Sequence, residues 1–182
     1  MTLVSTQSRD VQFAFTQEAK FLGALAPSDL SNLGLISALH GGIGFIAPVT
    51  QNDLKSEQVI RNLCRWRNDN LHAFSDGTAV SLQSTTLWLE KVLASGLKIL
   101  FKIFSQTQEM VGHIGLAWNS SESRLEIDNV IRGVADGPGI MGAALEYVEK
   151  YANIEFNADS LFLRVIKTNV HAIGFYERHG YI

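Results

Sequence analysis

Cysteine and proline are scarce in this sequence of 182 residues, which contains one Cys and three Pro. The single cysteine, Cys64, cannot form an internal disulfide, so we expect a protein of a reducing compartment. Basic residues are not in excess either, because 15 Lys and Arg stand against 18 Asp and Glu, a formal net charge of −3. This balance provides no electrostatic basis for binding nucleic acid or an anionic membrane surface.

Long apolar runs are missing as well. The most apolar window, residues 33–49, is interrupted near its middle by His40, Gly41, Gly42 and Gly44, whereas a spanning helix needs about 20 mostly apolar residues. The first residues lack the basic start and the unbroken apolar stretch of a signal peptide. We therefore expect a buried turn and strand in this window, no membrane contact and a cytoplasmic protein.

The residues that are present have the balance of a globular protein, with 46% hydrophobic and 18% charged residues. The length corresponds to one domain, or to one domain with a tail. Residues 1–40 have weak periodicity, and we expect there only a short helix capped by Ser28 or Asp29 and containing Leu30, Leu33 and Leu35.

From Gly44 onward the hydrophobic pattern alternates between strand and helix periods, which predicts a mixed α/β domain. Short polar connections between the three middle strands predict an antiparallel meander. The expected strands are 44–49, 98–104, 110–118, 124–131, 160–166 and one starting at Gly180. The expected helices run from Asn52 or Asp53 through Trp66, from Thr85 or Thr86 to Gly96, from Ile140 through Ala152, and over 169–178.

A glycine-rich turn precedes the third of these helices. Gly137, Gly139 and Gly142 allow a tight turn and close approach of a ligand, and the free amides of a helix start suit phosphate or pyrophosphate. A simple turn explains the glycines equally well. The P-loop pattern is absent, and the preceding strand belongs to a meander, so a dinucleotide-binding fold is not expected.

Three stretches of the chain, in this order, resemble the GNAT acetyl-CoA-dependent N-acetyltransferases. Residues 98–132 resemble the central meander of that family, and DGPGIMGAALEYVEKYA resembles the acetyl-CoA pyrophosphate loop and its helix. The most specific part is LFLRVIKTNVHAIGFYERHGYI. The resemblance covers residues 44–182 and implies a GNAT-like fold, with residues 1–43 as an N-terminal extension of unknown role.

The sequence departs from the family pattern at two places. The loop usually reads Arg/Gln-x-x-Gly-x-Gly/Ala, and the aligned positions here are Asp136, Gly139 and Met141. The family fold also continues with a last strand beyond the position of Ile182, so we expect a C-terminally incomplete domain or a neighbouring chain that supplies this edge. An open edge there would favour a homodimer.

By this resemblance, Tyr176 is the expected acid that protonates the departing thiolate, and Asn169 lies along the pantetheine arm. Helix packing for Tyr176 and helix capping for Asn169 are the alternatives. For the base we consider Glu126 and Asp128, which share one face of their strand, and His113 on the adjoining strand, or no dedicated base. Backbone amides near Asn129 would polarise the thioester carbonyl.

The remaining expectations concern binding. Arg67 and Arg132 are candidates for a phosphate or carboxylate of the substrate, with surface salt bridges as the alternative, and Trp66 is a candidate floor for a sugar, with core packing as the alternative. No metal is expected, because the five histidines lack metal-ligand spacing. The expected coenzyme-binding residues are Ile131, Gly133, Gly137, Gly139, Ile140, Met141, Gly142 and Asn169.

The resemblance implies transfer of an acetyl group from acetyl-CoA to a primary amine. RWRND and DNVIRG…PGIM resemble a branch that acts on nucleotide-linked amino sugars. An aminoglycoside or a protein N-terminus is the alternative acceptor. A non-catalytic acyl-CoA-binding or interaction domain is the alternative of another class.

Overall fold

The computed structural model describes residues 6–135 and 137–182. Its core is a six-stranded sheet in which the strands follow the order β1-β2-β3-β4-β5-β6. All neighbouring pairs are antiparallel except β5 and β6, which are parallel. The strands are β1 (Ser37–Ala38), β2 (Gly44–Pro48), β3 (Lys98–Ser105), β4 (Met110–Asn119), β5 (Arg124–Arg132) and β6 (Phe162–Leu163). The predicted meander is confirmed.

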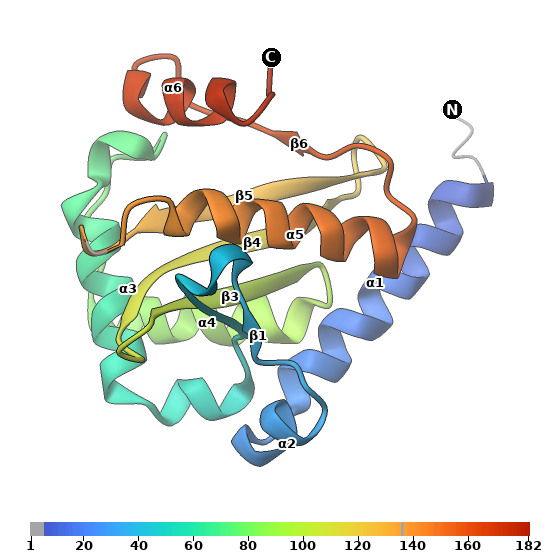
Figure 1. Ribbon diagram of the computed structural model, residues 1–182, viewed down its shortest axis with the longest axis horizontal. Coiled ribbons are helices and arrows are strands. Elements are labelled where there is room, and N and C mark those ends of the chain that lie inside the picture. The colour runs from blue at the N-terminus through green and yellow to red at the C-terminus, as the bar shows by residue number, and fades with distance from the viewer. Residues whose placement is uncertain (1–5, 136) are drawn as a thin grey trace.

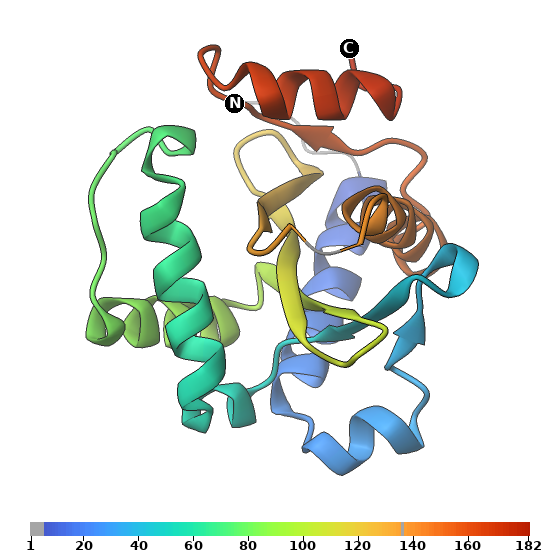
Figure 2. The same ribbon diagram turned by 60° about the vertical axis from the view of Figure 1, so that its left-hand side comes forward.

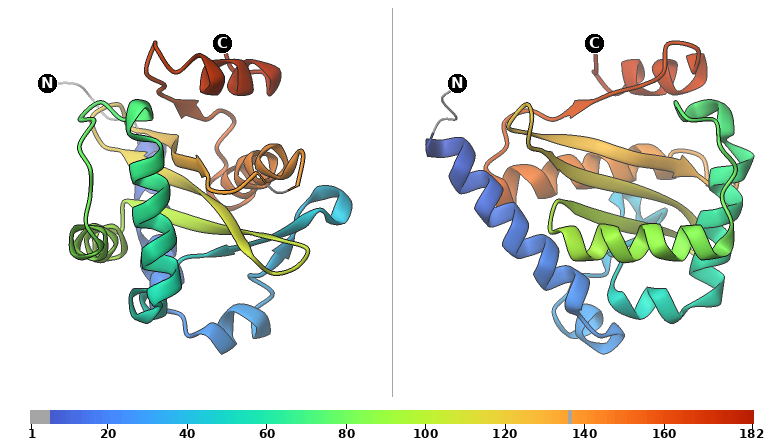
Figure 3. Two further views of the ribbon diagram at one scale, coloured as in Figure 1. Left: turned by 90° about the vertical axis from the view of Figure 1, so that its left-hand side faces the viewer. Right: turned by 180° about the vertical axis from the view of Figure 1, so that it is seen from behind.

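Helices cover both faces of this sheet (Figure 1). Helix α5 lies across one face, and α4 lies across the other with α3 beside it, as the view from behind shows (Figure 3). Helix α6 lies beyond β6, at the edge of the sheet (Figure 2). The helices are α1 (Thr6–Ala24), α2 (Pro27–Asn32), α3 (Glu57–Asp69), α4 (Leu82–Ser95), α5 (Ile140–Phe156) and α6 (Val170–Arg178).

The larger hydrophobic cluster fills the space between the sheet and α5, and α1 contributes to it. Phe15 and Leu22 of α1 are buried in the same cluster as Ile103 of β3 and Leu145 of α5. The described part of the segment before Gly44 therefore packs into the main core. A smaller cluster under α3 and α4 contains Leu63, Leu89 and Leu100.

The 19-residue helix α1 was not predicted, and the short helix α2 begins earlier than expected. Its first residue is Pro27, and Asp29 is not its cap but accepts a hydrogen bond from the backbone N–H of Ala26 at 2.9 Å. Leu33 and Leu35 follow the helix instead of belonging to it. Proline at the first helical position fixes this earlier start, because its ring presets a helical φ and its missing N–H would be unbonded there.

The first predicted helix also starts elsewhere. Asp53 belongs to a separate 3₁₀ helix (Gln51–Lys55), where its carboxylate accepts the backbone N–H of Thr50 at 2.7 Å. Ser56 then adopts an extended conformation and caps α3 by accepting the N–H of Val59 at 3.4 Å. In the same way Ser81 caps α4, four to five residues before the predicted threonines.

The C-terminal strands are shorter than predicted. Of residues 160–166 only Phe162 and Leu163 pair with β5, and residues 180–182 form no strand in the described part of the chain. Tyr181 is instead held by its hydroxyl, which donates to Glu149 of α5 at 2.7 Å. This side-chain bond directs the end of the chain toward α5 and away from β6.

Candidate active site

The glycine turn leads into α5 as predicted. Gly137 and Gly139 have φ values of +67° and +86°, a region that favours glycine, and Gly139 is the residue that caps the helix. The side chains of Ile140 and Met141 are buried, so the first turn of α5 presents backbone to its surroundings. Asp136 lies outside the described residues.

Met141 does not fill the turn. Its sulfur lies 3.1 Å from the position that a Cβ on Gly112 would take, so the side chain points down toward β4. Gly142, one position further along, lies against α6, because a Cβ there would be 2.5 Å from Nε2 of His179. Gly142 and Met141 therefore allow α5, β4 and α6 to approach closely, and the His179 ring lies against the first turn of α5 at Gly142.

A β-bulge interrupts β5 beside this turn. His113 of β4 pairs with Ile131, whereas Gly115, only two residues further, pairs with Asp128. The extra residue is taken up near Asn129, which has a φ of +49°. Ile131 is buried and continues the strand toward Gly133, whose N–H donates to the carbonyl of Val111 at 2.8 Å.

The bulge brings three of the predicted catalytic residues together. Burial raises the pKa of Tyr176 to about 12, and the nearby carboxylate of Asp128 adds to the increase. Burial lowers the pKa of His113 to about 4, partly offset by a hydrogen bond with the backbone of Asn129 and by the charge of Asp128. The charge of Asp128 thus acts on both the imidazole of His113 and the phenol of Tyr176.

His113 lies beneath Trp66 and is only 3% exposed. The imidazole and the indole are stacked, with centroids 6.2 Å apart and planes 25° apart. Within the described chain His113 Nδ1 and Trp66 Nε1 are buried and have no hydrogen-bond partner. Trp66 is 1% exposed, and its ring lies on Gly133, so it supports the end of β5 and does not present an open floor for a sugar.

Tyr176 and Asn169 both lie on α6, as predicted. Asn169 caps the helix by accepting the N–H of Ala172 at 3.2 Å, so the capping prediction is confirmed. The Tyr176 ring packs edge-on against Phe175 and against Tyr181. Among the described residues no hydrogen bond engages the Tyr176 hydroxyl, so it is available to a ligand.

Glu126 does not join this group. Its Oε1 accepts hydrogen bonds from Arg164 at 2.8 Å and from Asn119 at 2.9 Å. It shares the strand face of Asp128, as the alternation predicts, but its carboxylate is held by side chains from the far end of β4 and from the segment after β6. We therefore do not assign a proton transfer to Glu126.

The two predicted substrate arginines have different surroundings. Arg67 forms an ion pair with Asp76, and its guanidinium lies 3.4 Å from the centroid of the Phe74 ring, so it fastens the loop after α3. Arg132 is exposed, and its Nε donates to the carbonyl of Val134 at 3.2 Å. No other hydrogen bond engages the Arg132 guanidinium among the described residues.

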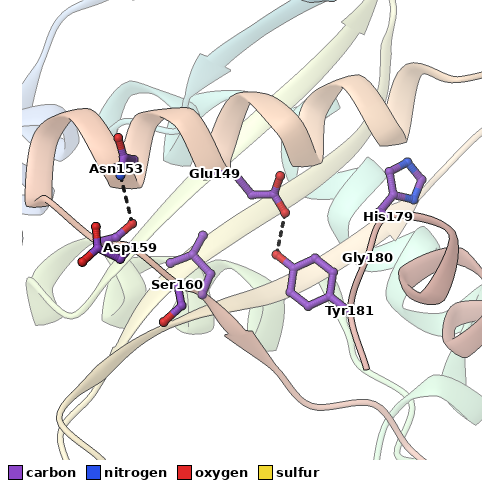
Figure 4. Close-up of a pocket in the computed structure, with 9 residues that line it drawn as sticks. Glu149, Asn153, Asp159, Ser160, His179, Gly180 and Tyr181 are labelled. Atoms are coloured by element: carbon purple, nitrogen blue, oxygen red, sulfur yellow. Dashed lines mark hydrogen bonds between the residues drawn. The ribbon is translucent and has the colours of Figure 1, made fainter.

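Sequence reasoning missed one charged residue of this site, Lys98 at the start of β3, which forms an ion pair with Asp128. Strand pairing alone does not reveal it, because the register places Lys98 in one row with Ala117 and Glu126, whereas Asp128 lies in the next row, with Gly115. A cavity of about 390 Å³ lies elsewhere, between α5, the segment before β6 and the end of the chain (Figure 4). None of the predicted site residues lines it.

Between residues 6 and 182, with position 136 left aside, no group of three or more His, Cys, Asp or Glu side chains could hold a metal ion. No helix in the same part of the chain is long and apolar enough to cross a membrane.

Residues 46–182 match the family described as "Acetyltransferase (GNAT) domain". The chain belongs to the GNAT acetyltransferase family. It is therefore an acyltransferase, and enzymes of this family use acetyl-CoA or CoA. No curated protein sequence matches the chain.

Solved structures of GNAT enzymes share the fold. RimL, a ribosomal-protein alpha-N-acetyltransferase in complex with coenzyme A, gives a TM-score of 0.63 at 13% identity over 80% of this chain and 82% of its own. FdhC, a nucleotide-linked sugar GNAT, gives a TM-score of 0.61 at 16% identity over 80% of this chain and 82% of its own. The spermidine/spermine N-acetyltransferase SpeG from Vibrio cholerae gives a TM-score of 0.56 at 16% identity over 77% of this chain and 78% of its own. At these identities the likeness shows the fold alone.

Proposed function

We propose that this GNAT protein transfers the acetyl group of acetyl-CoA directly to the primary amine of a small molecule. The observation that carries the proposal is the position of Asp128 at the bulge of β5, near the glycine turn that begins α5, where its charge acts on the phenol of Tyr176. The turn supplies an anion site, and the bulge supplies the acid–base groups.

The coenzyme would be held mainly by backbone. The amides of Met141 and Gly142 belong to the first turn of α5, where the helix dipole is positive and phosphate groups bind well. The N–H of Ile140 donates to the carbonyl of Gly137 at 3.3 Å and shapes the turn. Ile131 and Gly133 lie along the exit of β5, where an extended pantetheine arm can pair with the strand. Asn169 keeps its side-chain NH₂ group for the same arm, because only its oxygen is used in capping.

Tyr176 is our candidate acid. In the transfer, a bond forms between the amine nitrogen and the acetyl carbon, the carbon–sulfur bond breaks, and the thiolate takes the phenolic proton. Because the pKa of Tyr176 is raised to about 12, the phenol is protonated at neutral pH and can donate. Backbone amides beside Asn129 would stabilise the oxyanion of the tetrahedral intermediate.

Asp128 is our candidate for binding the acceptor amine and taking its proton. Its side chain is 36% exposed, whereas His113 is buried under Trp66 and Glu126 is held by Arg164. His113 would then act by supporting the bulge through the backbone of Asn129. The proton that the amine loses reaches Asp128 directly or through one water.

For the acceptor we propose an amino sugar linked to a nucleotide. Glu126 on the acceptor side of the sheet is paired with Arg164, and Asp128 has one oxygen engaged by Lys98. The pair thus offers a carboxylate oxygen to a single amine, which disfavours a polycation such as an aminoglycoside or a polyamine. The exposed guanidinium of Arg132 can bind a phosphate of the nucleotide. FdhC, described as a nucleotide-linked sugar GNAT, shares the fold.

The test is a thiol-release assay with acetyl-CoA and a panel of amines: nucleotide-linked amino sugars, an aminoglycoside, spermidine and a peptide with a free N-terminus. We expect release only with the nucleotide-linked sugars, together with one acetyl group per thiol by mass spectrometry. Tyr176→Phe should lower kcat by about 10²-fold or more while acetyl-CoA still binds. Equal turnover of spermidine, or an unchanged kcat in Tyr176→Phe, would contradict the corresponding assignment.

A further inference from the structure

A lysine reaches across one strand of the sheet to Asp128. Lys98 lies on β3 and Asp128 on β5, with β4 between them, and Lys98 Nζ forms an ion pair with Asp128 Oδ2. The residues of β4 opposite them are small, since Lys98 pairs with Ala117 and Asp128 with Gly115. The lysine stem can therefore cross the strand without meeting a large side chain.

Asn129 binds the same carboxylate from the bulge. Its backbone N–H donates to Asp128 Oδ1 at 2.8 Å, and its side-chain amide donates to Asp128 Oδ2 at 2.7 Å. The φ of +49° at Asn129 places both donors on one carboxylate. With Lys98, three donors fix the orientation of Asp128, and two of them use Oδ2. Since each oxygen accepts about two hydrogen bonds, Oδ1 keeps a free lone pair.

We propose that Lys98 is a positioning residue, which with Asn129 holds Asp128 so that its free oxygen faces the acceptor amine. The proposal rests on the function proposed above. Lys98 itself touches neither coenzyme nor acceptor in this role. It fixes the rotamer of the carboxylate before substrate arrives, which is how supporting residues maintain reactive geometry.

The first test compares Lys98→Met, which keeps the length of the stem and removes the charge, with Lys98→Arg, which keeps the charge. We expect Lys98→Met to lower kcat/KM for the acceptor by about 10-fold while the Kd of acetyl-CoA stays within twofold, and Lys98→Arg to recover most of the loss. Arg61→Met is the matched control, because it removes a cation from an exposed ion pair on α3, with Glu57.

A double substitution separates positioning from general damage. If Lys98 acts through Asp128, Lys98→Met should have no further effect on kcat/KM once Asp128→Asn is present. An additional loss of the same size in that background would overturn the proposal. So would a Lys98→Met enzyme whose acceptor kinetics equal those of Arg61→Met.

A readout that needs no turnover keeps the test independent of the proposed function. Removal of Lys98 leaves the negative charge of Asp128 uncompensated, so the pKa of His113 should rise by roughly half a pH unit in an NMR titration of its ring. Arg61→Met should leave it unchanged. An unchanged pKa of His113 in Lys98→Met would overturn the proposal, whereas a wild type that acetylates no amine would overturn only the proposed function.

Discussion

The contact between Gly133 and Trp66 gives the most sharply defined prediction. A Cβ added to Gly133 would lie 1.9 Å from Cε2 of the Trp66 ring and 2.2 and 2.3 Å from the two next nearest ring atoms. Ordinary carbon contacts are about 3.5–4.0 Å, so the ring would have to move by about 1.5 Å. Trp66 is 1% exposed and has no free space into which to move.

Gly133→Ala should therefore lower the free energy of unfolding by about 2–3 kcal/mol, the cost of overpacking a filled core. Because Gly133 leads from β5 into the coenzyme turn, the displacement should also weaken acetyl-CoA binding. The cost arises from the indole, so it should fall by about 1 kcal/mol or more when Trp66→Phe is already present.

Urea unfolding followed by circular dichroism measures these free energies. Gly174→Ala is the matched control: it lies inside α6, where the nearest atom to its Cβ is the flexible end of Arg178 at 3.5 Å. Alanine there should stabilise the protein by about 0.5–1 kcal/mol. A Gly133→Ala protein as stable as the wild type, or a cost that is the same in the Trp66→Phe background, would refute this account of the packing.

Three further predictions follow from the same structure. The pKa of His113 is lowered from 6.5 to about 4 in the folded protein, so the unfolded chain binds more protons between these pH values, and the free energy of unfolding should fall by about 3 kcal/mol as the pH drops from 6.5 to 4. A series of urea midpoints measured over this pH range should become flatter in His113→Gln. An equally steep series in that variant would contradict the burial of a neutral ring. Lys102→Met should lower the free energy of unfolding by about 3–5 kcal/mol, because it leaves the buried carboxylate of Asp53 without the partner that donates to it at 2.7 and 2.8 Å. Thermal or urea unfolding measures this loss, and a loss below about 1 kcal/mol would argue against that ion pair. Asn169→Ala should lower stability by about 1 kcal/mol through loss of the α6 cap, and Asn169→Asp should restore it; failure of the aspartate to restore stability would show that capping is not its contribution.

The meander, the glycine turn and α5 could be predicted because each rests on a local pattern. The apolar run of β3, the alternation at the start of β5 and the period of Ile140, Ala144 and Val148 in α5 agree with the burial found in the structure. The family assignment rests on the same segments. In these regions local preference and tertiary packing require the same conformation.

The sequence-based predictions of secondary structure are wrong where side chains contact residues that are far away in the sequence. Asp53 has the residue type of a helix cap, but it forms the ion pair with Lys102, so the predicted helix starts later. The buried residues of α1 are widely spaced among polar ones, and Phe15 and Leu22 are recognised as core only once α5 and β3 are packed against them. Packing of this kind leaves a weak local signal.

The sequence allowed candidate residues for the site to be named, but it did not reveal which partners hold their side chains. Tyr176 and Asp128 are found near each other, but strand alternation alone could not distinguish Asp128 from Glu126. The difference depends on partners from other elements: Arg164 binds Glu126, and Lys98 binds Asp128. The bulge at Asn129 was not predicted either, although it sets the position of both carboxylates relative to α6.

Binding of acetyl-CoA at the glycine turn is the most direct test of the whole account, and calorimetric titration of the purified protein measures it. We predict micromolar binding that is lost in Gly139→Trp, which places an indole at the start of α5. Gly34→Trp is the matched control. The φ of Gly34 is +67°, similar to the +86° of Gly139, and no heavy atom lies within 4 Å of the position that its Cβ would take. That control should bind like the wild type. No binding by the folded wild type, or equal binding by Gly139→Trp, would contradict the assignment of this turn as the coenzyme site.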